Sequence, residues 1–397
     1  MKEGWEYIDF KDVFPIKMGK TPPRGDKSSW DEKKETHNKW VSIADISNNE
    51  GKIIKDTKEY ISDSAAEKIS KVSKGSLLMS FKLSIGRMAF AGDDLYTNEA
   101  IIAIPESNKY ILRFMYYYLL SYNWLSLTEG NEKVKGATLN KSSIGRIQLP
   151  VLDFFEQQSI VDYLDSAFAK IDAMKANAEK ALNEAKTLFQ ASLKEMLEPK
   201  EGWEEKTLKE IAQIKIGPFG SLLHKKDYIT GGVPLVNPIH MVNGHIAIDN
   251  NYTIMESKAK ELSLYRLKEN DIVFARRGEI GRCALVGEKE DTYLCGTGSL
   301  FVRFNQVVDY GFMLLLFQSK YCKEYLEKQA TGATMLNINS AIVGDMPIKY
   351  PHIHIQQSIV ATLDSLKSKV DRLQANYEKI SQECDTLKQA ILRQVFE

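Results

Sequence analysis

The sequence predicts an α+β fold in which two similar mixed α/β domains are separated by a pair of long antiparallel coiled-coil helices. Three observations predict this architecture. An uninterrupted heptad pattern fills residues 355–396. A second heptad pattern lies 199 residues earlier in the chain. The segments that precede the two heptad patterns also repeat each other, so the whole chain is an internal two-fold repeat.

The two helical segments carry apolar residues spaced alternately three and four positions apart, with no Gly or Pro between them. A stripe this narrow, kept for roughly six heptads, is typical of a helix that packs lengthwise on another helix. We therefore expect a seam of contacts between the two segments. The expected seam residues are Ile160, Leu164, Ile171, Met174 and Leu188 in the first segment and Ile359, Leu363, Leu366, Val370, Leu373, Ile380, Leu387 and Ile391 in the second.

The two seams differ in side-chain size, which favours their pairing. The first is rich in Ala and the second in Leu, Ile and Val, so large side chains can fill the space beside small ones. A helix of about 42 residues is roughly 60 Å long. Because residues 198–203 are too few to cross that length again, we expect an antiparallel pair with one domain at each end. The alternatives are a parallel pair, or helices that pack only on their own domains.

The elements of the two halves follow the same order. Each half opens with Gly-Trp-Glu, at residues 4–6 and 202–204. A loop with Gly, Pro and Lys follows, and then strand patterns rich in β-branched and aromatic residues. An apolar helix comes next, at residues 110–126 and 311–329, before a last strand and the long helix. The expected boundaries are 1–152 for the first domain, 153–198 for the first long helix, 199–351 for the second domain and 352–397 for the second long helix.

Length and composition narrow the class of protein. The 397 residues suffice for two domains of ordinary size. Because 53 Lys and Arg balance 53 Asp and Glu, the net charge does not indicate nucleic-acid binding, although a local basic face would be enough for it. Four cysteines without C-x-x-C spacing indicate free thiols in a reduced compartment. No signal peptide or membrane-length apolar run is present, so we expect a cytoplasmic protein that does not bind membranes.

The motifs that could carry catalysis are incomplete. Gly19-Lys20-Thr21 imitates the end of a phosphate-binding loop, but Phe14 stands where that loop needs Gly. The segment 237–240 begins like the Asn-Pro-Pro-aromatic box of amino-methyltransferases, but it lacks the second Pro and the aromatic ring. The six histidines do not cluster at metal-ligand spacing. We therefore expect no catalytic residue, metal or cofactor in this chain.

Basic residues lie on the Gly-containing loops of both halves, at similar points of the repeat. Such loops can approach phosphates closely, and Arg can also bind O6 and N7 of guanine. Arg276 and Arg277 are the strongest pair, because adjacent arginines beside a Gly turn are costly without an acidic partner. For any single residue, ordinary solvated charge is the alternative. The candidate DNA-binding residues are Lys17, Lys20, Thr21, Arg24, Lys27, Ser80, Lys82, Arg87, Lys215, Ser221, His224, Lys225, Lys226, Arg276, Arg277 and Arg282.

Three motifs together carry a resemblance to a known family. They are Gly-Pro-Phe-Gly-Ser at residues 217–221, the segment 272–282 with its Arg-Arg-Gly turn, and Glu-Gln-Gln at residues 156–158 before a long helix. With these motifs and its repeat, the whole chain resembles the DNA-specificity (S) subunit of type I restriction-modification systems. The first half departs from the pattern, since Phe-Lys-Leu at residues 81–83 replaces Arg-Arg-Gly and Gly-Lys-Thr-Pro-Pro at residues 19–23 replaces Gly-Pro-Phe-Gly-Ser.

The resemblance implies a non-catalytic subunit that binds double-stranded DNA. Each globular domain would be a target-recognition domain that reads one half of a bipartite sequence. The paired helices would set the spacing and dock two modification (methyltransferase) subunits, which bind S-adenosylmethionine and methylate adenine at N6. Restriction subunits would add ATP- and Mg²⁺-dependent cleavage in the full complex. The alternative class is a non-catalytic coiled-coil adaptor that joins two protein-binding domains.

Overall fold

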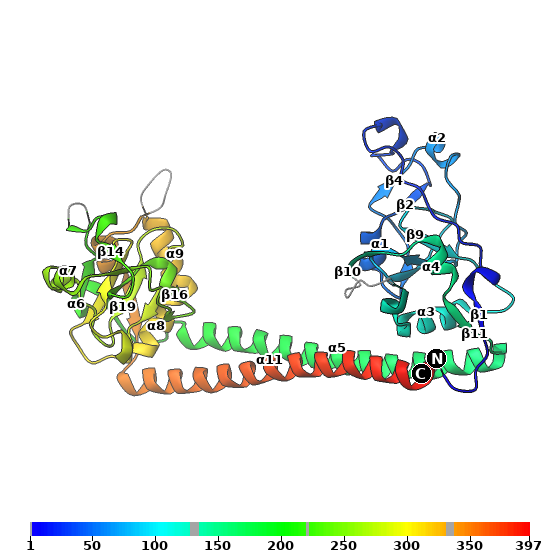
Figure 1. Ribbon diagram of the computed structural model, residues 1–397. Helices are drawn as coiled ribbons and strands as arrows, with labels where there is room; N and C mark the ends of the chain where they lie inside the picture. Colours follow the sequence, from blue (N-terminus) through cyan, green and yellow to red (C-terminus); the bar gives the residue numbers. More distant parts are fainter. Residues whose placement is uncertain (1, 128–134, 220–221, 331–336) are drawn as a thin grey trace. The chain divides into compact units, whose positions relative to one another are not determined.

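The computed structural model describes residues 2–127, 135–219, 222–330 and 337–397 (Figure 1). The chain forms two compact units, which we call unit 1 (Met1–Glu179 with Tyr377–Glu397) and unit 2 (Lys180–Asn376). The two long helices, α5 (Phe154–Leu197) and α11 (Ile353–Phe396), each contribute one part to unit 1 and the other part to unit 2.

Unit 1 is a mixed α/β unit. Its described strands are β1 (Tyr7–Asp9), β2 (Lys39–Val41), β3 (Ile53–Ile54), β4 (Glu59–Tyr60), β5 (Leu77–Ser80), β6 (Lys82–Ser84), β7 (Met88–Ala91), β8 (Tyr96–Thr97), β9 (Ile101–Ile104), β10 (Lys135–Thr138) and β11 (Gln148–Pro150). Its shorter helices are η1 (Phe10–Asp12), η2 (Lys27–Ser29), α1 (Ile43–Asn48), α2 (Asp63–Ala66), α3 (Leu112–Ser121), η3 (Trp124–Leu127) and α4 (Lys141–Gly145). The larger sheets have the strand orders β3-β7-β5-β9 and β4-β2-β8, and β1 pairs with β11 and β6 with β10.

Unit 2 repeats this arrangement. Its described strands are β12 (Glu204–Thr207), β13 (Ala212–Ile216), β14 (Tyr228–Ile229), β15 (Val233–Val236), β16 (Met241–Val242), β17 (His245–Ile246), β18 (Thr253–Ile254), β19 (Ile272–Ala275), β20 (Cys283–Leu285), β21 (Leu294–Cys295), β22 (Ser299–Phe304) and β23 (Pro347–Tyr350). Its shorter helices are α6 (Leu208–Ile211), η5 (Lys225–Asp227), η6 (Pro238–His240), α7 (Glu256–Glu261), η7 (Ser263–Tyr265), η8 (Glu288–Glu290), α8 (Tyr310–Gln318), α9 (Lys320–Gln329) and α10 (Ser340–Gly344). The larger sheets have the orders β13-β22-β19-β20 and β14-β18-β15-β21, while β12 pairs with β23 and β16 with β17.

The central strands of the sheets in the two units have matching neighbours, although the fourth strand of the larger sheet is β3 beside β7 in unit 1 and β13 beside β22 in unit 2. In unit 1, β5 lies between antiparallel neighbours β7 and β9, and in unit 2, β19 lies between antiparallel neighbours β20 and β22. The second sheet also matches, because β2 and β15 each have one parallel and one antiparallel neighbour. All residues of β5 and β19 are buried, which explains their unbroken runs of mostly apolar residues. The predicted fold class and internal repeat are confirmed.

The predicted apolar helix at residues 311–329 is two helices, α8 and α9. The interruption lies at Ser319, whose backbone is extended and whose hydroxyl accepts a hydrogen bond from the backbone N–H of Cys322. Ser competes with the helix by bonding nearby backbone groups and is favoured at helix N-termini. In unit 1, the corresponding prediction for residues 110–126 is the helix α3, followed by the short helix η3.

Each unit holds its segments of the long helices through its own core. In unit 1, Val161 and Leu164 of α5 and Phe396 of α11 pack with aromatic side chains of α3. In unit 2, Leu197 of α5 and Ile359 of α11 pack with side chains of α8. None of the helices that the structure describes combines the length and the apolar character needed to cross a bilayer.

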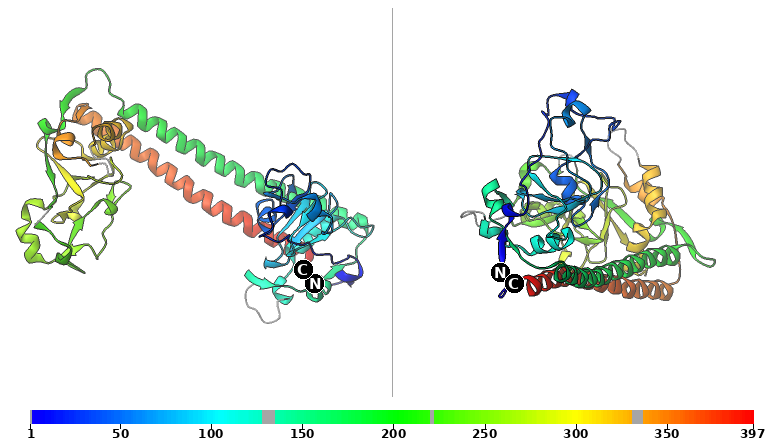
Figure 2. Two further views of the ribbon diagram at one scale, coloured as in Figure 1. Left: turned by 90° about the horizontal axis from the view of Figure 1, so that it is seen from above. Right: turned by 90° about the vertical axis from the view of Figure 1, so that its right-hand side faces the viewer.

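The two long helices pair antiparallel within each unit. In unit 1, the carboxylate of Asp172 binds Lys388, and Lys175 lies 3.5 Å from Asp385, so residue numbers rise along α5 as they fall along α11. Figures 1 and 2 show the two helices side by side in this unit, with the chain termini next to each other. In unit 2, the Nζ atom of Lys186 donates to Gln374 at 2.8 Å. The antiparallel prediction is confirmed in both units.

Of the thirteen predicted seam residues, nine are buried or half-buried and four are exposed. Leu164, Ile171, Leu363 and Val370 are buried. The remaining predicted residues that lie partly buried along the pair are Ile160, Ile359, Leu366, Ile380 and Ile391. The prediction is wrong for Met174, Leu188, Leu373 and Leu387, which are 59%, 61%, 36% and 47% exposed.

The cause of this error is a neighbouring column of residues. In α5, the buried or half-buried residues that complete the seam lie one position later, at Val161, Phe168, Lys175, Leu182 and Phe189. Four of these five are apolar, so the three-four spacing fits both columns equally well. In α11, Gln374 and Lys388 are half-buried where Leu373 and Leu387 were expected. Both polar side chains bond across the pair, to Lys186 and Asp172 respectively, and the sequence pattern does not reveal such partners.

Candidate nucleic-acid interface

The arginine-rich turn of unit 2 is held by backbone hydrogen bonds on both sides. After β19, the N–H of Arg276 donates to the carbonyl of Gly298 at 2.9 Å. The carbonyl of Arg276 accepts from the N–H of Ile338 at 3.0 Å. Asn339 follows directly and caps α10, because its side chain accepts the N–H of Ile342 at 2.9 Å. The turn therefore sits on a fixed frame between β22 and the start of α10.

Unit 1 builds the same frame around a different side chain. The N–H of Phe81 donates to the carbonyl of Ala100 at 2.9 Å, and its carbonyl accepts from Leu139 at 2.9 Å. Asn140 then caps α4 by accepting the N–H of Ser143 at 2.8 Å. Phe81 therefore occupies the position that Arg276 occupies in unit 2. The sequence comparison of Phe-Lys-Leu at residues 81–83 with Arg-Arg-Gly at residues 276–278 therefore agrees with the backbone positions in the two units.

Arg276 is buried with a neutral partner. Its side chain is 9% exposed, and Nε donates to the carbonyl of Ile338 at 3.2 Å. Among the described residues, no carboxylate forms an ion pair with it. Burial lowers the pKa of the Arg276 guanidinium, and the charge of Arg277 lowers it further. Arg nevertheless stays protonated in proteins, so the turn holds a buried positive charge.

Arg277 lies on the outside of the same turn. Its side chain is exposed, and its backbone forms an antiparallel bridge with Asn337. Gly278 follows with φ of +80°, a conformation that Gly adopts readily. Within the described parts of the chain, Arg277 has no ion-pair partner, and the buried Oδ1 atom of Asn337 has no hydrogen-bond donor. Two adjacent cations therefore lack a counter-charge in the described structure.

Arg282 supports the turn instead of presenting a free charge. Its guanidinium binds the carboxylate of Glu279 and donates to the carbonyl of Pro238 at 3.2 Å. The segment 237–240 comes directly after β15, as expected for a strand end, and forms η6. The N–H of Asn237 donates to Nδ1 of His240 at 3.1 Å, so this histidine caps a turn. Burial lowers the pKa of His240, which keeps the ring neutral.

The glycine of the first motif in unit 2 allows a close approach between segments. A Cβ atom on Gly217 would lie 2.0 Å from the carbonyl oxygen of Gly296. Gly19 of unit 1 has the same role, since its Cβ would lie 2.0 Å from the carbonyl oxygen of Thr97. Any side chain at either position would displace the neighbouring strand end. This is a structural reason for Gly at the start of both loops.

The two candidate arginines of unit 1 are already paired with carboxylates. Arg24 binds Glu59 through two nitrogens, and its guanidinium lies 4.2 Å from the Trp30 ring and 4.9 Å from the Trp40 ring. Arg87 forms an ion pair with Glu50. Glu59 is 35 residues from Arg24 in the sequence, and Glu50 is 37 residues from Arg87. Both candidates are therefore neutralised by partners that loop spacing could not reveal.

The other candidates of unit 1 differ in their exposure. Ser80 is fully buried, and its hydroxyl donates to the carbonyl of Ser84, so its prediction as a DNA contact is wrong. It is the last residue of the central strand β5, and the next residue, Phe81, is buried as well. Thr21 donates to Glu99, and Lys82 is half-buried with Nζ 5.6 Å from the Phe81 ring. The exposed candidates are Lys17, Lys20 and Lys27.

The remaining candidates of unit 2 lie on β13 and before β14. Lys215 is half-buried on β13 opposite Phe301. His224, Lys225 and Lys226 are exposed at η5, where the N–H of His224 donates to Asp227 at 2.7 Å. Ser221, predicted as a contact, lies outside the described residues. These lysines fit phosphate contacts better than base readout, because an ammonium acts as a single point charge.

One buried glutamine in each unit joins the start of a long helix to the backbone of a preceding segment. Gln157 accepts the N–H of Ile111 at 2.8 Å and donates to the carbonyl of Lys109 at 2.8 Å. Gln356 accepts the N–H of Asp309 at 2.9 Å and donates to the carbonyl of Pro351 at 2.7 Å. The repeated Gln-Gln motif indicated this point of the chain, but its spacing gave no sign that the first Gln is buried.

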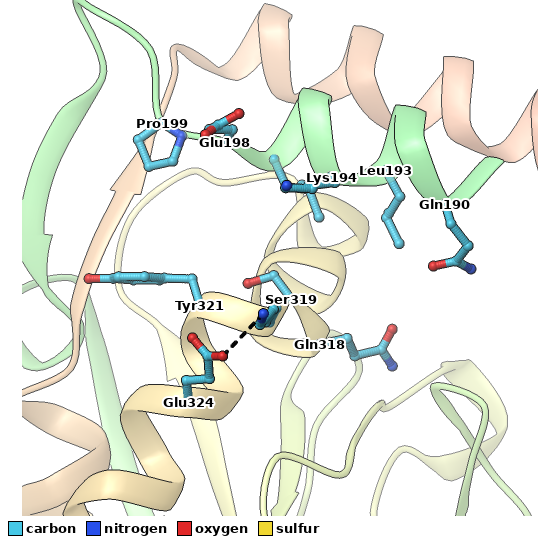
Figure 3. Close-up of a pocket in the computed structure, with 11 residues that line it drawn as sticks. Gln190, Leu193, Lys194, Glu198, Pro199, Gln318, Ser319, Tyr321 and Glu324 are labelled. Atoms are coloured by element: carbon cyan, nitrogen blue, oxygen red, sulfur yellow. Dashed lines mark ion pairs between the residues drawn. The ribbon is translucent and has the colours of Figure 1, made fainter. Parts of the chain in front are cut away.

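A pocket of about 610 Å³ in unit 2 lies between the end of α5 and the junction of α8 and α9. Figure 3 shows Leu193 and Lys194 of α5 on one side and Ser319 and Tyr321 on the other. Its lining has no His or Cys, and Lys320 is 3.5 Å from Glu324. Over the described ranges, no three His, Cys, Asp or Glu side chains gather as a metal site requires. The described side chains that line this pocket therefore do not form a catalytic or metal-binding group.

Two segments of the chain, residues 2–184 and 200–382, match the family described as "Type I restriction modification DNA specificity domain". The two matches cover most of the chain and follow its internal repeat. The chain belongs to this family, as the resemblance of its motifs predicted.

Individual relatives are distant in sequence. The specificity subunit of the type I restriction enzyme MjaIX from Methanocaldococcus jannaschii is 23% identical over 297 residues, which cover 69% of this chain and 66% of that protein. The MjaVIII specificity subunit of the same organism is 22% identical over 347 residues, covering 81% of each chain. The EcoBI specificity subunit of Escherichia coli is 21% identical and covers 73% of this chain and 66% of that protein. The chain thus spans slightly less than two thirds of the MjaIX and EcoBI subunits.

Solved structures share the fold at similarly low identity. The HsdS subunit from Thermoanaerobacter tengcongensis has a TM-score of 0.62 and 16% identity, and the match covers 100% of this chain and 97% of that one. A chain from a structure of the assembly and conformational transition of the type I R-M system has a TM-score of 0.72 and 17% identity, with 100% and 98% covered.

Proposed function

We propose that this chain is the non-catalytic DNA-recognition subunit of a type I restriction-modification enzyme, and that each unit reads one half of a bipartite DNA target. The main support is one backbone frame built twice with different side chains at its centre, Phe81 in unit 1 and Arg276 in unit 2. Phosphate contacts position a protein on DNA, whereas base contacts specify sequence. Two domains with the same backbone frame but different central residues are suited to read two half-sites of different sequence.

The long helices would act as the spacer between the two half-sites. Each has 44 residues and is therefore about 66 Å long at 1.5 Å per residue. This length corresponds to at most roughly 19 base pairs at 3.4 Å each. We propose half-sites about one helical turn apart, with bases of any identity between them.

The helix pair would also dock two modification subunits. Met174, Leu188, Leu373 and Leu387 are exposed apolar residues on the pair, and such residues are available to partner chains. The modification subunits would bind S-adenosylmethionine and methylate adenine at N6, and restriction subunits would supply ATP- and Mg²⁺-dependent steps. This chain would bind no cofactor and would work in the cytoplasm, bound to double-stranded DNA and not to a membrane.

Sequencing of methylated adenines in a host that carries this chain and a modification subunit tests the proposal. We expect one motif made of two short specified parts separated by unspecified bases. A single uninterrupted motif would contradict the bipartite reading. If the purified complex has no salt-dependent affinity for DNA, the chain is instead an adaptor between protein-binding domains.

Insertion of one heptad into both helices tests the spacer. Seven residues would be added after Glu179 in α5 and before Tyr377 in α11, which keeps the heptad pattern. The added length is about 10 Å, so the gap in the methylated motif should grow by roughly three base pairs. A control carries the same residues in the turn at Gly231, outside the helices. An unchanged gap in the heptad variant would contradict the spacer role.

A further inference from the structure

The turn at Arg276 and Arg277 has a charge pattern that the other candidate arginines lack. Arg24, Arg87 and Arg282 lie on comparable loops, and each is bound to a carboxylate. Arg276 and Arg277 lie next to each other, and neither forms an ion pair with a described residue. Removing a cation from water without a counter-charge is costly, so a site that keeps two of them is suited to a ligand rich in hydrogen-bond acceptors.

The two arginines have different surroundings. Arg276 is buried and bonds the carbonyl of Ile338, so it ties the turn to the segment before α10. Arg277 is exposed, and the bridge to Asn337 fixes its backbone. A fixed backbone reduces the freedom that the side chain must lose on binding, which favours a directional contact over a diffuse attraction.

We propose that the turn of unit 2 reads a guanine in the major groove. Arg277 donates two hydrogen bonds to O6 and N7 of the base, and Arg276 is a positioning residue that holds the turn. This inference rests on the proposed function, because it names the base that one unit recognises.

The chemistry favours guanine over a phosphate. The guanidinium is a planar fork of donors, and guanine presents two acceptors at matching spacing on its major-groove edge. A phosphate needs only charge, which the exposed lysines at η5 already provide. Unit 1 places Phe81 and Lys82 at the corresponding positions, so this bidentate contact would be confined to the half-site read by unit 2.

The experiment uses the full chain in complex with a modification subunit and duplexes that carry the mapped target. Each guanine of the half-site is replaced in turn by 7-deazaguanine, which lacks the N7 acceptor but keeps base pairing. We expect one position at which this replacement weakens binding. In Arg277→Ala the same replacement should have no effect, and discrimination against other bases there should fall about five- to hundredfold.

Two further variants separate reading from positioning. Arg276→Phe introduces the residue that unit 1 carries in the same frame, and it should reduce discrimination at that guanine while leaving the other half-site unchanged. Arg276→Lys should restore part of the discrimination. Arg266→Ala is the matched control, because Arg266 of unit 2 lies outside the turn and is paired with Glu256 at 2.8 Å, and it should leave guanine discrimination unchanged.

Two results would overturn the inference. If no 7-deazaguanine position weakens binding, the site does not read guanine N7. If Arg277→Ala weakens all duplexes equally and reduces the salt dependence of binding, Arg277 is a phosphate contact. Failure of the wild-type complex to prefer any sequence would instead refute the proposed function, so the two failures are distinguishable.

Discussion

The turns after β5 and β19 share a backbone but differ in chemistry. In unit 1, the frame surrounds the buried ring of Phe81, and the two candidate arginines of the unit are bound to Glu50 and Glu59. In unit 2, the same frame surrounds Arg276, with Arg277 exposed beside it. The frame depends on backbone hydrogen bonds and on a capping Asn, which do not involve the central side chain. A central residue can therefore change without loss of the fold.

The largest expected effect concerns the segments of the long helices that are packed in each unit. Ile171→Ala in unit 1 and Leu182→Ala in unit 2 remove buried seam side chains, so each should lower the free energy of unfolding of its unit by about 2–5 kcal/mol. Hydrogen exchange measured by mass spectrometry in increasing urea reports the two units separately. The matched controls Met174→Ala and Leu188→Ala change exposed residues and should cost less than about 0.5 kcal/mol. Equal losses in variants and controls would contradict the corrected seam.

The buried glutamines should have equal importance in the two units. Gln157→Ala leaves the N–H of Ile111 without its acceptor, and Gln356→Ala does the same to Asp309. We expect each change to lower the free energy of unfolding of its own unit by about 2–3 kcal/mol, because buried backbone groups lose their partners. Hydrogen exchange at the start of α3 and of α8 measures this loss. Gln158→Ala and Gln357→Ala change the exposed neighbours and serve as controls. A loss in only one unit would show that the scaffolds are not equivalent.

Alkaline pH should lower the stability of the two units to different extents, because different weakly acidic side chains are buried in them. In unit 2, burial raises the pKa of the Cys283 and Cys322 thiols to about 12. In unit 1, burial raises the pKa of Tyr110 to about 12. The unfolded thiols ionise near pH 9 while the folded ones stay protonated, so the unfolded state binds fewer protons. Stability is therefore complete below pH 9 and falls between pH 9 and 12, by about 1 kcal/mol per thiol at pH 10.

Substitution of both thiols tests this assignment. In the double variant Cys283→Ala and Cys322→Ala, the slope of the free energy of unfolding of unit 2 between pH 9 and 11 should decrease, whatever its absolute value. Part of the slope should remain, because burial also raises the pKa of the Cys295 thiol. Urea unfolding at several pH values measures the slope, and unit 1 in the same molecule is the internal control. An unchanged slope in unit 2 would show that other groups cause it.

The smallest expected effect concerns the paired arginines. Glu50→Gln in unit 1 frees Arg87, and Glu279→Gln in unit 2 frees Arg282. Each released cation should strengthen binding to any duplex a few-fold at low salt and steepen the salt dependence by up to about one phosphate contact. Fluorescence anisotropy against salt concentration measures both quantities. Unchanged binding would show that these arginines lie away from the DNA.

The sequence predicted the fold well because a repeat shows each signal twice. The heptads and the Gln-Gln motif recur after 199 residues and the Gly-Trp-Glu opening after 198, which distinguishes them from chance patterns. The seam column was not predictable, because Phe168 and Leu182 make a second apolar column beside the first. Periodicity identifies a face of a helix but not which of two adjacent columns is in contact.

The candidate site was predicted less completely, because charge partners are distant in sequence. Nothing local to Arg87 indicates Glu50, and nothing local to Lys388 indicates Asp172. Ser80 shows a different problem, since it ends the buried strand β5 and is followed by the buried Phe81. Arg276 and Arg277 were found because adjacent arginines beside Gly are unusual without an acidic neighbour, and this signal is local.

The central claim is that two equal scaffolds carry different readers, and an exchange of the turn tests it most directly. The double variant Arg276→Phe and Arg277→Lys gives unit 2 the central residues of unit 1. Sequencing of methylated adenines should then show one half-site relaxed or changed, with the other half-site and the gap between them unaltered. Changes in both half-sites, or in neither, would contradict the account.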